Sequence, residues 1–125
     1  MKRSLFLTIV AIVNAAFGLG LLVTPAMVLS RYGVTLDAGG VLTAKFLAAA
    51  LIGQTLVLWM GRNEPDSPAM NGILWGGFVA NLLEGVAAKK AVLAGVMNSM
   101  GWLVVAMDIL IAIGFASYLF GKKKT

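Results

Sequence analysis

The sequence contains no cysteine and no histidine. The chain therefore cannot form disulfides, Cys/His zinc sites or the usual axial ligation of haem. A serine or cysteine nucleophile activated by histidine is excluded for the same reason. The remaining polar side chains form no recognisable catalytic set, so we expect a protein without enzymatic activity. The composition does not identify a cofactor. It is compatible with a bound lipid or pigment, which needs no His or Cys ligand.

Charged residues are also scarce. They make up 12% of the 125 residues, whereas 60% of the residues are hydrophobic. Soluble domains carry about 25% charged residues and about 45–50% apolar ones. A chain this short cannot bury so many apolar side chains without lipid or a partner. The composition therefore indicates an integral membrane protein.

Four apolar segments have the length of about 20 residues that a membrane-spanning helix needs. They cover about residues 5–23, 38–60, 68–88 and 98–120. The connections between them are short, which makes consecutive helices antiparallel neighbours. We therefore expect an all-α fold, an up-down-up-down four-helix bundle that forms one transmembrane domain over residues 1–125.

Proline, glycine and short polar residues mark the ends of these segments. Pro25 and Gly33 are expected to start and stop a short interfacial helix over about residues 25–32. Asp37 and Ser67 precede the second and third segments. Their side-chain oxygens are expected to accept a hydrogen bond from the first helical turn.

The end of the third segment is marked only by Lys89 and Lys90, because no proline separates Gly85 from Gly101. We place a turn near the two lysines. Residues 91–97 then form either the first turns of a long, tilted fourth helix or a short interfacial segment.

The N-terminus also has some features of a secretory signal. Lys2 and Arg3 precede an apolar run, and Val13-Asn14-Ala15 resembles a cleavage site. Because the apolar run continues to Val23, we expect this segment to stay in the protein as a spanning helix.

Basic residues at the chain ends and in the loops set the expected orientation. In a four-span chain both ends lie on one side, and that side carries six basic residues against three on the other. The positive-inside rule then places both termini in the cytoplasm, although Lys89 and Lys90 oppose it. Contacts with anionic lipid explain the net charge of +5 more economically than nucleic acid does. The expected headgroup anchors are Lys2, Arg3, Arg31, Arg62, Lys122, Lys123 and Lys124.

Three charged residues, Lys45, Glu84 and Asp108, fall inside the predicted spans and at similar depth, in the outer half of the bilayer. Each costs about 2.5–3.5 kcal/mol near a helix centre, so a charge kept there normally faces protein or water and has a partner. Asn14 and Asn81 are expected to join the three charges in an inward-facing polar cluster.

Each of these charges shares a helix face with small residues four positions apart. Small residues at this spacing mark close helix contacts in membranes. The residues expected to pack the helices are Gly18, Ala49, Gly53, Gly72, Gly76, Ala80, Ala112 and Ala116.

Three interpretations of the polar cluster stay open. It is an ion pair or triad, Lys45 with Glu84 or Asp108, that fixes the register of the helices. It is a polar cavity, open to the outer side, that binds a small solute or passes a proton. It is a set of charges that pair with another subunit.

The first half of the chain resembles small bacterial four-span membrane proteins of unknown function, including DoxX-like ones. The shared features are Pro25, Gly33, Lys45, Gly53 and the sequence Trp59-Met60-Gly61-Arg62. The resemblance implies a helical bundle in the bacterial inner membrane and carries over no catalytic residue.

The loops are too short to form a soluble domain, so the chain can contact other proteins mainly through its helices. We expect an accessory or structural subunit that packs within a larger membrane assembly. The alternative is a small homo-oligomeric transporter or channel that uses the Lys/Glu/Asp cluster. The expected partners are the lipid bilayer and other membrane subunits or further copies of the chain, and no nucleic acid.

Overall fold

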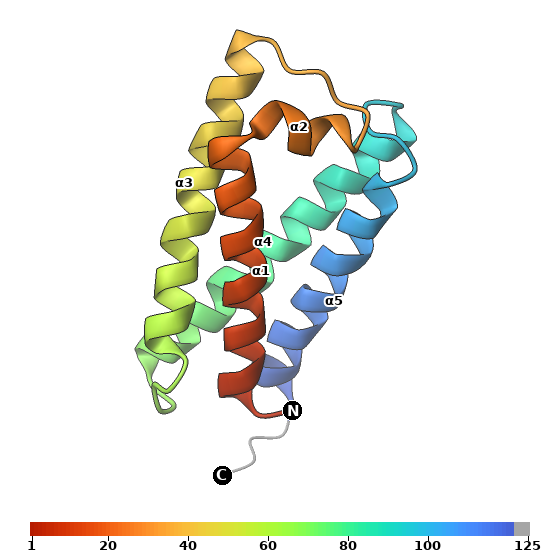
Figure 1. Ribbon diagram of the computed structural model, residues 1–125. Coiled ribbons are helices and arrows are strands. Elements are labelled where there is room, and N and C mark those ends of the chain that lie inside the picture. The colour runs from red at the N-terminus through yellow and green to blue at the C-terminus, as the bar shows by residue number, and fades with distance from the viewer. Residues whose placement is uncertain (122–125) are drawn as a thin grey trace. The chain divides into compact units, whose positions relative to one another are not determined.

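The computed structural model describes residues 1–121, and every regular element in that range is a helix. The helices are α1 (Arg3–Val23), α2 (Pro25–Ser30), α3 (Ala38–Gly61), α4 (Pro68–Leu93) and α5 (Gly101–Phe120). The predicted all-α class is therefore confirmed. The contacts divide the chain into two compact units, one that holds α1, α2 and α3 and one that holds α4 and α5 (Figure 1). A single domain built as one four-helix bundle stays a prediction.

The predicted helix ends agree with the local hydrogen bonds. The Asp37 carboxylate accepts a hydrogen bond from the backbone N–H of Gly40 at 2.7 Å, which caps α3. The Ser67 hydroxyl accepts one from the N–H of Met70 at 3.1 Å, which caps α4. Gly33 adopts a φ of 75° after α2, the left-handed conformation in which glycine ends a helix at no steric cost.

The turn predicted near Lys89 and Lys90 is wrong. Helix α4 continues through both lysines to Leu93, because alanine and lysine are good helix formers and no proline interrupts them. The chain turns at Gly95, where φ is 77°. The N–H of Val96 donates to the carbonyl of Ala91 at 2.8 Å, and these features form a Schellman motif. Residues 91–97 therefore end α4 and turn, and do not begin α5.

In the first unit, α1 and α3 lie side by side, and α2 follows directly after α1 (Figure 1). Gly18 allows the two long helices to approach closely. A Cβ atom at that position would lie 3.0 Å from Ile52 Cγ1 and 3.3 Å from the carbonyl oxygen of Ala48. The Thr55 hydroxyl also donates to the Ala11 carbonyl across the same contact, at 3.4 Å. The buried residues of α1 are Leu7, Val10, Ala11, Asn14, Gly18 and Leu21.

In the second unit, α4 and α5 pack against each other through two glycines of α4. A Cβ atom on Gly77 would overlap the fully buried ring of Phe115. A Cβ atom on Gly85 would lie 2.8 Å from Ile109 Cδ1. The two helices therefore meet where α4 has no side chain. The buried residues of α4 are Met70, Leu74, Gly77, Asn81, Gly85 and Ala88.

Three helices, α1, α3 and α5, are long and apolar enough to cross a membrane. Their outward faces carry large apolar side chains, such as Ile12, Phe46 and Leu110, which are more than half exposed. Lipid, and not water, is the solvent that suits such surfaces. The structure therefore supports a helical membrane protein. Helix α4 does not meet the same standard of apolarity among the described residues, because it carries two asparagines, two lysines and Glu84.

The close contact at Gly77 gives the first prediction. Gly77→Ala should lower the free energy of unfolding by about 1–3 kcal/mol, because Phe115 has to move to accept the new methyl group. Gly72→Ala is the matched control, since nothing lies within 4 Å of a Cβ atom at that position. SDS titration followed by circular dichroism measures both variants. Equal stabilities would contradict the packing of α4 on α5 described here.

Candidate functional site

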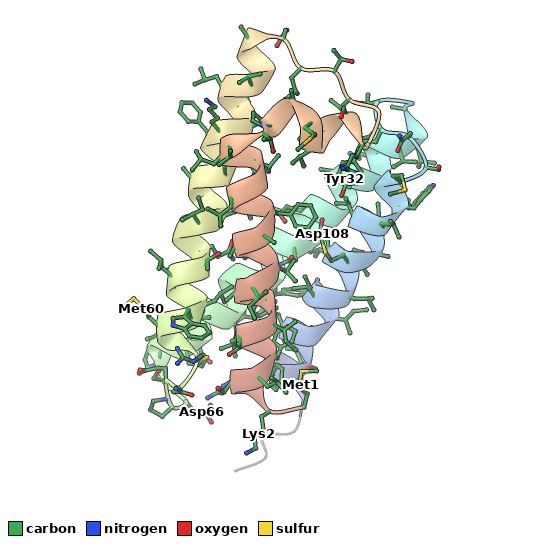
Figure 2. The ribbon with its side chains drawn as sticks, viewed as in Figure 1. Met1, Lys2, Tyr32, Met60, Asp66 and Asp108 are labelled. Atoms are coloured by element: carbon green, nitrogen blue, oxygen red, sulfur yellow. The ribbon has the colours of Figure 1, made fainter. Side chains whose placement is uncertain are left out.

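Asp108 is the most buried charged residue of the described chain, with 5% of its surface exposed. It lies on α5, near the middle of that helix (Figure 2). Its Cβ atom is 3.4 Å from the position that a Cβ of Gly85 would occupy. Asp108 therefore faces α4, at the point where the absence of a side chain on Gly85 lets the two helices approach.

Glu84 is the neighbour of Gly85 on α4 and is exposed. Its carboxylate interacts electrostatically with that of Asp108. Within residues 63–121, neither carboxylate forms an ion pair or accepts a hydrogen bond. The α4–α5 unit thus holds two negative groups near each other, one buried and one open, and neither pairs with a lysine within residues 63–121.

Asn81 is buried on the same side of α4, one helical turn before Gly85. Its side-chain amide donates a hydrogen bond to the carbonyl of Gly77 at 2.8 Å. This bond satisfies one amide hydrogen of Asn81 inside its own helix. The second unit therefore brings together three members of the predicted cluster, Asn81, Glu84 and Asp108. The described residues hold no group of three or more His, Cys, Asp or Glu residues that could bind a metal ion.

The other two members of the predicted cluster, Asn14 and Lys45, belong to the first unit. Asn14 is 8% exposed, and its amide nitrogen is buried without a hydrogen-bond partner. Lys45 lies on an exposed face of α3. The predicted ion pair of Lys45 with Glu84 or Asp108 joins residues of different units and stays a prediction.

The predicted packing residues divide into two groups. Gly18 and Ala112 are buried, and Ala80 and Ala116 are half-buried. In contrast, four of the predicted residues are exposed, and the three glycines among them have nothing within 4 Å of an added Cβ atom; they are Ala49, Gly53, Gly72 and Gly76. These four therefore make no close contact within their own unit, and their role in helix packing stays a prediction.

The reason lies in helix geometry. A row of residues four apart turns by 40° at each step around a helix with 3.6 residues per turn. The row Gly72, Gly76, Ala80 and Glu84 therefore begins on the side of α4 opposite its buried residues and does not follow the contact with α5. The buried seam of α4 combines steps of four and of three residues from Met70 to Ala88, as in other closely packed helix pairs. The steps of four that the sequence suggested follow a different face.

Gly77 and Gly85 are important for the contact and were not among the predicted residues. For Gly85 a signal exists in the sequence. Leu7, Asn14 and Gly18 on α1 have the same spacing as Leu74, Asn81 and Gly85 on α4, and all six residues are buried. Each unit thus places a buried asparagine four residues before the glycine at which its helices meet.

The expected headgroup anchors of the first unit lie at its two ends. Lys2 and Met60 mark one end of this unit, and Tyr32 marks the other (Figure 2). The Arg62 guanidinium lies 3.9 Å from the ring centroid of Trp59 and donates a hydrogen bond to the carbonyl of the same residue. Such stacking of a cation on tryptophan is common at membrane interfaces. Arg3 begins α1, Arg31 follows α2, and Lys122, Lys123 and Lys124 lie outside the described residues.

Comparisons with known proteins found no protein-family model, no curated protein and no solved structure that matches this chain. They therefore give no support to the resemblance to DoxX-like proteins. The function has to be argued from the chain itself.

The absence of a cation paired with Asp108 within residues 63–121 gives a second prediction. Asp108→Asn keeps the shape of the side chain and removes its charge, so the unit should keep its stability or gain some. Glu84→Gln, on the exposed side of the same helix pair, is the control, and it should change the free energy of unfolding little. SDS titration of each variant measures the effect. A loss of about 3–5 kcal/mol for Asp108→Asn would instead show that a buried cation pairs with Asp108.

Proposed function

We propose that this chain is a small protein of the bacterial inner membrane that crosses the bilayer four times and serves as an accessory or structural subunit. Its activity is to pack its helices against those of partner subunits. The observation that carries this proposal is the exposed face of α3 that holds Lys45, Ala49 and Gly53.

This face suits protein better than lipid. Lys45 lies seven residues into a helix that is apolar enough to span a membrane, and it forms no ion pair with Asp37, the one acidic side chain of its unit. A charge at such a depth normally faces protein or water. Ala49 and Gly53, on the same face, would let the backbone of a neighbouring helix approach closely. A partner helix with a carboxylate would satisfy both features.

The proposal includes α4 as the fourth span. Its 26 residues extend about 39 Å at 1.5 Å per residue, which exceeds the hydrocarbon core of about 30 Å. The positions of its polar residues are compatible with a membrane-spanning helix. Asn81 is buried against α5, Glu84 lies beside Asp108, and Lys89 and Lys90 are close to the end of the helix. The positive-inside rule then supports cytoplasmic termini, with Lys2, Arg3 and Arg62 on that side.

The proposal predicts that the native protein is extracted in a complex. Extraction in mild detergent followed by native mass spectrometry should show the chain bound to other subunits. Gly53→Leu places a large side chain on the exposed face of α3 and should reduce this association by about tenfold or more. Ala50→Leu, at an exposed position of α3 outside that face, is the matched control. A wild-type chain that is extracted only as a monomer would contradict the proposal, and so would equal loss in both variants.

Asp108 favours a second candidate function, a small homo-oligomeric transporter or channel. A buried carboxylate that pairs with no cation within residues 63–121 is the kind of group that takes up and releases a proton in membrane transport. Vesicles that contain the purified protein and a pH-sensitive dye test this function. Proton or solute flux that Asp108→Asn abolishes would support transport. The absence of flux through the wild-type protein would exclude it.

A further inference from the structure

Two exposed faces of the chain complement each other. The α3 face consists of Lys45, Ala49 and Gly53. The α4 face consists of Gly76, Ala80 and Glu84, of which Ala80 is half-buried and the others are exposed. Nothing lies within 4 Å of a Cβ atom added to either glycine of the two faces. Each face is thus a shallow strip of small residues with one charge at its end, positive on α3 and negative on α4.

The spacing of the two faces matches when the helices run in opposite directions. Lys45 then lies opposite Glu84, Ala49 opposite Ala80, and Gly53 opposite Gly76, each one step of four residues from the last. Consecutive spans alternate in direction, so α3 of one chain and α4 of another chain in the same membrane are antiparallel. Rows of residues four apart on both helices match where the two axes cross at about 50°, and the small residues let the backbones approach there.

The two charges also match in depth. Lys45 lies seven residues after Ala38, where α3 begins, and Glu84 lies nine residues before Leu93, where α4 ends. At 1.5 Å per residue these distances are about 10 Å and about 14 Å from the same side of the membrane. The long, flexible side chain of lysine spans a difference of this size. The ammonium group and the carboxylate can therefore meet without a shift of either helix.

We propose that the α3 face of one chain packs on the α4 face of a second copy, with Lys45 of each chain paired with Glu84 of the other. This inference rests on the proposed function and names the partner as another copy of the same chain. Charge complementarity favours a second copy over a foreign subunit. The chain itself supplies a face with the opposite charge, the same residue spacing and the antiparallel direction. The proposed dimer has two-fold symmetry, so the contact forms twice. The small residues allow the close approach, and the ion pair removes two unpaired charges from lipid.

Reversal of one charge at a time, Lys45→Glu in one chain and Glu84→Lys in another, tests the proposal. A K45E chain alone places two carboxylates at each contact, and an E84K chain alone places two ammonium groups there. Each single variant should lose dimer stability by about tenfold or more. A mixture of the two variants restores an opposite pair at both contacts, so it should form a heterodimer with wild-type stability. Native mass spectrometry of differently tagged chains resolves these species.

The absence of cysteine from the sequence allows a direct check of the register. A chain with Gly53→Cys and a differently tagged chain with Gly76→Cys should form a disulfide-linked heterodimer in membranes under mild oxidation. Chains with Ala50→Cys and Val86→Cys, at exposed positions outside the two faces, are the controls and should not cross-link. Because cross-linking is done in the membrane, it also reports on dimers too weak to survive extraction.

Three outcomes would overturn the proposal. The first is a dimer that neither charge variant weakens. The second is rescue only when K45E and E84K are on one chain, which would place the contact within a chain. The third is a wild-type chain that binds foreign subunits but forms no dimer and no cross-link. This third outcome would leave the proposed accessory function standing, whereas a chain that is always monomeric and unbound would remove both.

Discussion

Close approach of helix backbones at glycine is the constraint on which this structure depends. Lipid is as apolar as the side chains of a membrane helix, so no hydrophobic force presses two helices together inside a bilayer. Van der Waals contact has to replace that force, and it requires backbones that come near each other. Gly18 provides this in the α1–α3 pair, and Gly77 and Gly85 provide it in the α4–α5 pair. The position of a glycine on its helix therefore decides which face becomes the inside of each unit.

The polar residues follow from the same constraint. Asn14 and Asn81 each lie four residues before a contact glycine and are buried in the seam of their unit. Asp108 faces α4 at Gly85, where an added Cβ atom would lie 2.8 Å from the adjacent Ile109 side chain. Lys45 and Glu84 lie instead on faces that their own units leave open. Polar groups therefore lie in the seams of both units, and the charges on the open faces are suited to select a partner.

The sequence alone predicts the helices well and their contacts poorly. The capping by Asp37 and Ser67 and the end at Gly33 depend on residues nearby in the chain, so local chemistry suffices to find them. The contact glycines are harder to find, because glycine and alanine occur on almost every face of these helices. Gly77, and not its neighbour Gly76, is the contact glycine because the ring of Phe115 on α5 packs against it. The local sequence around the two glycines contains no information about Phe115.

The most direct test is whether α4 packs on α5 through the face that holds Gly77 and Gly85. The accessibility of residues along α4 to dissolved oxygen answers this. Nitroxide labels on cysteines introduced one at a time at Leu74, Ala88, Gly72 and Val79 report contact with dissolved oxygen. Measurement in detergent, at a dilution where the chain is monomeric, isolates the packing within one unit. The account predicts low accessibility at Leu74 and Ala88, which are buried, and high accessibility at Gly72 and Val79, which are exposed. Low accessibility at Gly72 together with high accessibility at Leu74 and Ala88 would show that α4 packs through its other face, and would contradict the account.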